Sequence, residues 1–192
     1  MPETSETLAG RISYVELTPF TVPETGEVKN LWVKGGFPKS YLAKDDTVSQ
    51  AWRQSFIKTF LEQDIPKLGI KIPSENLRRF WMMLAHYQGC IFNASDIAGA
   101  LGLTNKTIKH YADILSHTFM IRQLKPWSIN IAKRQVKSPK IYIRDSGIFH
   151  TLLGIHNMDD LLVHPKLGAS WECFALEEII RHHSAELEEC YF

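Results

Sequence analysis

The segment from 93 to 115 constrains the fold more than any other, because its residue pattern predicts two short helices joined by a tight turn. Ser95 can cap the first helix, Gly102 stands where that helix must end, and Thr104 can cap the second. The face that the first helix should bury consists of Ile97, Ala98 and Leu101. This arrangement is typical of a helix-turn-helix motif.

The second helix of this motif separates buried from exposed positions. Its apolar face is formed by Ile108, Tyr111, Ala112 and Leu115. Its outward positions are Lys106, Lys109, His110 and Asp113. In DNA-binding proteins of this kind, the N-terminal part of the second helix enters the major groove. The spacing therefore predicts a surface that presents basic side chains to a duplex.

Two strand-like runs follow the helix pair, FMIRQL at 119–124 and KIYIRD at 140–145. The polar connection between them carries the basic residues Lys125, Lys133, Arg134 and Lys137. Two antiparallel strands beside three helices, with a basic loop at their tip, make a winged helix. We predict this architecture for residues 91–144.

Charge is unevenly distributed along the chain, although the formal net charge is only +1. Residues 101–144 carry nine basic side chains against Asp113 alone, whereas residues 159–192 carry eight acidic side chains against two basic. A basic segment that coincides with a helix-turn-helix is what a DNA-binding module requires to neutralise phosphates. The alternative is that this basic face meets the acidic end of the same chain, or an acidic partner domain.

Before the helix-turn-helix, the pattern changes from extended to helical. Residues 11–36 are rich in β-formers and punctuated by prolines and glycines, which indicates a strand, a loop and a turn. From Ser49 the apolar residues recur with helical spacing until Pro66, which should bar a further turn. A second helix follows Pro73, with Ser74 as its cap. Its apolar face consists of Leu77, Phe80, Trp81 and Leu84.

Two more helices are expected after the strands. Asp145 can cap a helix over 146–153, which Gly154 ends. A last helix at about 168–183 should bury one side. That side is formed by Trp171, Phe174, Ala175 and Ile179.

Composition excludes several classes of protein. With 44% hydrophobic and 11% aromatic residues the chain can bury a core, which argues against disorder. The longest apolar run, residues 80–85, is far too short to span a bilayer, and the N-terminus shows no secretion signal. Cys90, Cys173 and Cys190 have no CxxC spacing and fit a reducing compartment. We therefore expect a soluble, cytoplasmic protein with no membrane partner.

Familiar catalytic motifs are missing from the sequence. It contains no GxxxxGKS or GxxxxGKT phosphate loop, no HExxH zinc motif and no GxSxG nucleophile elbow. His182 and His183 are adjacent, so on a helix they diverge by about 100° and read as solvated surface residues. The chain alone is therefore not expected to hydrolyse nucleotide or to need a cofactor.

Several segments, read together, resemble a known family. They include LWVKGGFPKSYLA at 31–43, FIKTFLEQDIP at 56–66, SPKIYIRDSG at 138–147 and GASWE at 168–172. From about Ser5 to its last residue, the chain resembles the C-terminal module of prokaryotic AAA-plus-type ATPases, catalogued as domain of unknown function 4143. Such proteins are similar to a P-loop ATPase core followed by a helical segment, a winged helix and a module like the PD-(D/E)xK nucleases.

The resemblance implies roles for individual positions. SETLAGR at 5–11 looks like the end of an ATPase core, and Arg11 matches its terminal arginine, which can act on phosphate charge; the alternative is pairing with a neighbouring carboxylate. Glu172 corresponds to a helix-borne acid that can join a divalent metal site; the alternative is an exposed or hydrogen-bonded helix glutamate. Cys173 stands where the family is expected to have glycine. ATP and a divalent metal are implied only for full-length relatives.

The resulting expectation is a helix-rich α+β chain that lacks the ATPase core and completes no nuclease site. Its divisions are an ATPase-core tail (1–21), a linker (22–48), a helical segment (49–90), a winged helix-turn-helix (91–144) and an incomplete nuclease-like module (145–192). Because the last helix lacks the sheet that it should cover, we expect a loosely held C-terminus.

Three functions are compared. The first is a non-catalytic module whose winged helix binds double-stranded DNA, with Asn105 and Thr107 touching base edges. The duplex would be positioned by Lys106, Lys109, His110, Lys133, Arg134 and Lys137. The second is a protein-interaction or regulatory domain that docks on the ATPase core, on other subunits or on a second copy. The third, an ATPase or nuclease, is the weakest, because both sites lack essential parts.

Overall fold

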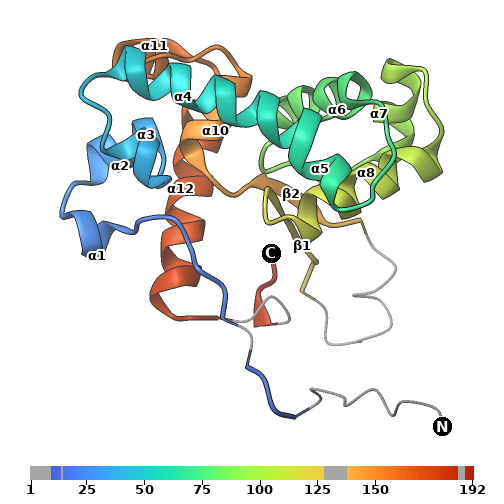
Figure 1. Ribbon diagram of the computed structural model, residues 1–192, viewed down its shortest axis with the longest axis horizontal. Helices are drawn as coiled ribbons and strands as arrows, with labels where there is room; N and C mark the ends of the chain where they lie inside the picture. The colour runs from blue at the N-terminus through green and yellow to red at the C-terminus, as the bar shows by residue number, and fades with distance from the viewer. Residues whose placement is uncertain (1–9, 14, 128–137, 186–188) are drawn as a thin grey trace, which may run out of the picture.

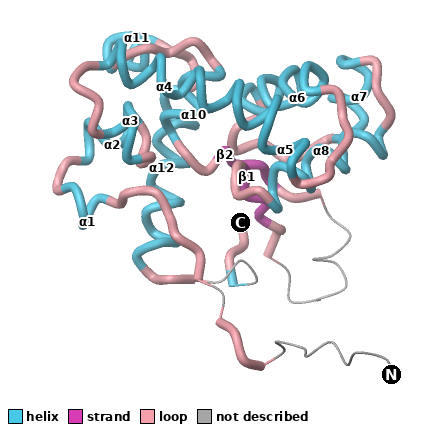
Figure 2. The backbone as a smooth tube through the Cα atoms, viewed as in Figure 1, coloured by secondary structure: helices cyan, strands magenta, loops and turns pink. Residues whose placement is uncertain are grey.

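The structure, a computed structural model, describes residues 10–13, 15–127, 138–185 and 189–192. It confirms a helix-rich α+β fold, whose described residues form a single sheet of two antiparallel strands. Figure 2 shows that helices make up most of the molecule and that the strand pair lies near its centre. None of the helices in the described ranges is long and apolar enough to cross a membrane.

The chain opens with short helices where we predicted extended structure. Their bounds are α1 (Val22–Thr25), α2 (Val28–Lys34) and α3 (Pro38–Tyr41). The prediction of a strand, a loop and a turn for 11–36 was wrong, because the described residues before Val22 form no strand. Glu24 accepts hydrogen bonds from the backbone N–H and the hydroxyl of Thr21 and so starts α1. Gly26, at φ 68°, ends that helix in the left-handed conformation. The segment 22–48, interpreted as a linker, therefore carries three helices.

The helical period from Ser49 correctly predicts the next element. α4 (Asp46–Thr59) runs through a π-helical turn, η1 (Phe60–Asp64), directly into α5 (Ile65–Lys67). The helix ends at Lys67, one residue after Pro66, so no further turn follows the proline, as predicted. The wide turn, in which the Ile65 N–H bonds to the Phe60 carbonyl, resets the hydrogen-bond register, so Pro66 falls in the first turn of α5, where its missing N–H is tolerated.

The central helices bury the faces that the sequence predicts. Their bounds are α6 (Ser74–His86), α7 (Ala94–Leu101) and α8 (Asn105–His117). On α6 the completely buried side chains include Leu77, Phe80, Trp81 and Leu84. Gly102 ends α7 and the Thr104 hydroxyl caps α8, as predicted. The cap of α7 is Asn93 rather than Ser95, because the Asn93 side-chain oxygen accepts two N–H groups at the start of that helix.

The two predicted strands form a hairpin. β1 (Ile121–Leu124) pairs antiparallel with β2 (Lys140–Ile143), and Ile121 lies opposite Ile143. Helix α6 packs on α7, α8 and β2, and α8 packs on β1. Residues 128–137 of the connection lie outside the described residues. The assignment as a winged helix-turn-helix stays a prediction.

Three helices follow the hairpin in the described part of the chain. Their bounds are α10 (Ser146–Leu152), α11 (Met158–Val163) and α12 (Leu167–His182). Asp145 caps α10 as predicted, and its second oxygen accepts the Gly36 N–H at 2.8 Å, which ties α10 to the chain after α2. Figure 1 shows α10 and α12 between α1–α3 on one side and α6–α8 on the other.

The predicted inner face of α12 was largely wrong. Of the predicted side chains only Phe174 is buried, while Trp171 is 46% and Ile179 is 60% exposed. The buried residues of α12 are instead Ser170, Cys173, Phe174, Glu177 and Ile180. A carboxylate thus takes an inward position because it has cationic partners there.

Alanine substitutions at two glycines, Gly147 in α10 and Gly99 in α7, test how closely α10 is packed. A Cβ on Gly147 would overlap the backbone carbonyl of Lys34, whereas a Cβ on Gly99, within α7, would meet no atom within 4 Å. We expect Gly147→Ala to lower the free energy of unfolding by about 2 kcal/mol or more through overpacking. Gly99→Ala should raise it by about 0.5–1 kcal/mol, because alanine favours the helix.

Urea unfolding of both variants beside the parent chain measures this difference. Equal effects of the two substitutions would show that the approach of α10 to α2 does not constrain the fold.

Candidate nucleic-acid interface

The start of α8 presents the residues that we predicted to meet DNA. Lys106, Lys109 and His110 are exposed, and the structure brings them together on the first two turns of the helix. Neither lysine has an ion-pair partner within the described ranges. Asp113 is exposed one turn further along. The helix therefore keeps two uncompensated positive charges near its N-terminus.

The two residues predicted to read bases already have partners. The Asn105 side-chain amide donates to the Ser95 hydroxyl at 2.9 Å, which joins α8 to α7. The hydroxyl of Thr107 lies 2.8 Å from that of Thr104, within the cap of α8. Both side chains thus help to hold the helix pair. Lys133, Arg134 and Lys137, predicted for the wing, lie outside the described residues.

The arginines on and next to the hairpin are largely buried, and each pairs with a carboxylate. Arg122, on β1, donates from Nε and Nη2 to the two carboxylate oxygens of Glu177, at 2.5 and 3.1 Å. Arg144, just after β2, donates from Nε to Glu177 at 3.2 Å and from Nη2 to Glu16 at 2.5 Å. Arg181 Nη2 lies 3.7 Å from the same Glu177 carboxylate. Glu177 is therefore surrounded by three guanidinium groups.

This carboxylate stays ionised despite its burial. Burial alone raises the pKa of Glu177, but the hydrogen bond from Arg122 and the charges of Arg122, Arg144 and Arg181 together bring that pKa below its ordinary value. Burial likewise lowers the pKa of Arg122, and Glu177 more than offsets it, so that pKa is raised. Both partners of the central ion pair are thus charged at neutral pH.

The alternative interpretation of the basic segment is therefore correct for part of it. Besides the arginines, Lys140 on β2 has its Nζ 3.9 Å from Glu172 of α12. Arg122, Arg144 and Lys140 meet carboxylates of the same chain, two of them from its acidic end. The opposite charges of 101–144 and 159–192 suggested this contact, but they did not identify which residues pair.

The residues with roles implied by family resemblance have ordinary surroundings. Glu172 is exposed, and it accepts the Tyr142 hydroxyl at 2.7 Å. Burial, followed by this hydrogen bond, raises the pKa of Tyr142. Arg11 is exposed. In the part of the chain that the structure describes, no three His, Cys, Asp or Glu residues are grouped so that they could hold a metal ion.

A serine and a histidine form a buried pair that the sequence did not reveal. The Ser170 Oγ lies 2.7 Å from His150 Nε2 and accepts the indole N–H of Trp32 at 2.8 Å. His150 Nδ1 lies 3.0 Å from the Val33 carbonyl, so this nitrogen carries the proton and Nε2 accepts from the serine. Ser170 is 0% and His150 1% exposed, so no substrate can reach them. The pair joins α10 and α12 to α2 rather than performing nucleophilic chemistry.

Comparison with known proteins places the chain among relatives of greater length. A family model described as a domain of unknown function, DUF8612, matches residues 25–159. The uncharacterized proteins Mb2031c of Mycobacterium bovis and Rv2008c of Mycobacterium tuberculosis are each 48% identical to the chain over 177 residues. That region is 91% of this chain but 40% of each relative. No solved structure matches the chain.

The buried histidine makes stability depend on pH. Burial lowers the pKa of His150 to about 4 in the folded protein, whereas an unfolded histidine titrates near 6.5. Between these values the unfolded chain binds a proton that the folded chain does not, so stability should fall as the pH falls from about 6.5 to 4, by up to about 3 kcal/mol. Urea unfolding at a series of pH values measures this decrease.

The control is His150→Gln, which lacks the titrating group. Its stability should change less over the same pH interval. Equal pH dependence of the two proteins would mean that folding does not lower the pKa of His150.

Proposed function

The chain belongs to the DUF8612 family, and we propose that it acts as a non-catalytic module whose α7–α8 helix pair binds the phosphates of duplex DNA. The observation that carries this proposal is the exposure of Lys106 and Lys109 on the first turns of α8, without carboxylate partners in the described ranges. The two lysines are three residues apart and so project from one side of the helix. The N-terminal end of α8 adds the positive end of its dipole.

The geometry favours contacts to phosphates over reading of bases. Reading a base with Asn105 would require its side-chain amide to leave Ser95, and Thr107 to leave Thr104. Phosphate contacts need only the exposed lysines and the imidazole of His110. We therefore propose binding of moderate strength, governed by salt and little affected by sequence, with Lys133, Arg134 and Lys137 as further contacts.

We also propose that the chain corresponds to a C-terminal part of an AAA-plus-type ATPase. The GGFP, LEQDIP and GASWE segments support this resemblance, and the matched region covers only 40% of each mycobacterial relative, which leaves room for a core. In that assembly Arg11 would belong to the ATPase site and Glu172 to an incomplete nuclease-like site. ATP and a divalent metal would be ligands of the longer proteins.

A second candidate function, docking on an ATPase core or other subunits, has an observation of its own. Helices α11 and α12 leave large apolar side chains exposed in the described structure. These are Leu162 (55%), Val163 (85%), Trp171 (46%) and Ile179 (60%). Exposed apolar surface of this kind can mark a protein interface.

DNA binding is tested by titrating the chain into a labelled duplex at several salt concentrations. We expect the affinity of Lys106→Ala/Lys109→Ala to fall, and the slope of log K against log salt to become shallower by about 0.9 for each phosphate that the variant no longer neutralises. The control is Lys29→Ala, which removes an exposed lysine from α2 on the opposite side of the molecule (Figure 1).

Affinity that is independent of salt, or an equal decrease in the double variant and in Lys29→Ala, would exclude this interface. If light scattering then showed association with a separately supplied ATPase portion, the docking function would be favoured instead.

A further inference from the structure

A cavity of about 270 Å³ lies beside the arginine cluster, between the N-terminal segment and the turn that follows α8. Its apolar wall includes Leu17, Phe37 and Phe119. Its charged wall consists of Glu16, Arg144, Asp145 and Arg181, and the carboxylate of Asp145 already accepts the N–H groups of Gly36 and Ile148. It adjoins a wider groove of about 700 Å³, which has Glu16, Phe119, Arg144 and Arg181 in common with it and adds Arg122. Three guanidinium groups therefore border one continuous space.

We propose that this cavity binds a phosphate monoester with an aromatic body, and that the carboxylate of Glu16 occupies the phosphate position at rest. Glu16 reaches Arg144 from 128 residues away in the sequence, with an oxygen 2.5 Å from Nη2. Its side chain remains 42% exposed, whereas that of Arg144 is 10% exposed. The contact thus joins a buried cation to an anion that can leave for solvent.

Arg181, which also lines the cavity, has a hydrogen-bond donor that Glu16 leaves without a partner. Its side chain is only 8% exposed, and its Nε has no hydrogen-bond partner within the described ranges. A buried donor without a partner is unfavourable, and native structures contain few of them. A carboxylate offers two oxygens, whereas a phosphate monoester offers three that can accept from Arg144 and Arg181 together. The unused donor therefore favours phosphate.

Phe119 supplies the reason to expect an aromatic body. It adopts φ 62°, a left-handed conformation that bulky residues rarely take, and the residue is 57% exposed. The guanidinium carbon of Arg144 lies 5.7 Å from the centre of this ring. The strained backbone thus holds an aromatic face at the edge of the cavity, next to the cation that would bind the phosphate.

This site is separate from the proposed DNA surface. Phe119 follows the C-terminal end of α8, whereas Lys106 lies at its N-terminal end, roughly 20 Å away along a helix of 13 residues. A cavity of 270 Å³ admits a small ester but no duplex. A failure to bind DNA would therefore leave this proposal intact, and the reverse also holds.

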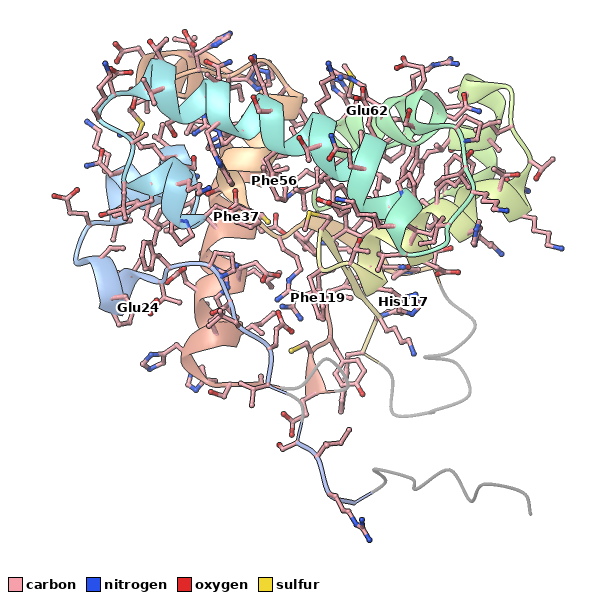
Figure 3. The ribbon with its side chains drawn as sticks, viewed as in Figure 1. Glu24, Phe37, Phe56, Glu62, His117 and Phe119 are labelled. Carbon is pink, nitrogen blue, oxygen red and sulfur yellow. The ribbon has the colours of Figure 1, made fainter. Side chains whose placement is uncertain are left out.

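The test is calorimetric titration of the full chain with phenyl phosphate, and with benzoate as the matched carboxylate, at ionic strength held constant with chloride. We expect saturable binding of phenyl phosphate and weaker binding of benzoate. Glu16→Gln, which removes the competing charge, should bind phenyl phosphate about fivefold more tightly. The control Glu62→Gln makes the same change on η1, well apart from Phe119 (Figure 3).

A second variant, Phe119→Gly, distinguishes the contribution of the aromatic contact to binding from that of the phosphate contacts. Glycine accepts the left-handed backbone, so the fold should keep its stability, while the affinity for phenyl phosphate should fall to that for inorganic phosphate. The proposal is overturned if no chain binds phenyl phosphate saturably, if benzoate binds as tightly, or if Glu16→Gln and Glu62→Gln bind equally. An unchanged affinity for phenyl phosphate in Phe119→Gly would overturn the aromatic part.

Discussion

The buried carboxylate of Glu177 is the group on which the arrangement of hairpin and last helix depends. It accepts hydrogen bonds from Arg122 of β1 and from Arg144 after β2, while Arg181 of α12 lies within ion-pair distance. Removing such a carboxylate from water costs several kcal/mol, and only well-placed donors offset this cost. Arg122 in turn depends on this carboxylate, because Glu177 is its ion-pair partner within the described residues, whereas Arg144 also pairs with Glu16 and Arg181 with Glu178. The hairpin and α12 can therefore reach this packed state only together.

This cluster determines which positive charges remain available to a partner. Arg122, Arg144 and Lys140 belong to the basic segment by sequence, but carboxylates of the same chain neutralise them. The charge that stays exposed in the described part of the segment is concentrated at the start of α8 and at Lys125. The proposed DNA contact is accordingly narrower than the total charge of the segment indicates. The neutralised arginines border a cavity, where Glu16 alone of their carboxylate partners is substantially exposed.

Features that depend on residues close in sequence, such as helix caps and helix ends, could be predicted. Features that depend on contacts between residues far apart in sequence could not. Gly102, Thr104 and Asp145 end or cap helices through neighbours within a few residues, so their roles were clear from sequence. The helices α1–α3 span four to seven residues, too few to show a period, and depend on caps instead. The face of α12 was misjudged because hydrophobic periodicity treats Glu177 as exposed, while its partner Arg122 lies 55 residues earlier. Of the candidate site, the exposure of the α8 lysines was predicted, and the arginine-lined cavity was not.

A double-mutant cycle between Arg122 and Glu177 tests the central claim most directly. Urea unfolding would be measured for the parent chain, Arg122→Met, Glu177→Gln and the combination of the two. If the pair holds the hairpin to α12, each single substitution deprives a buried charge of its nearest partner. The double variant is then destabilised by much less than the sum, with a difference of at least about 2 kcal/mol. Additive effects, with a coupling within about 0.5 kcal/mol of zero, would contradict the account.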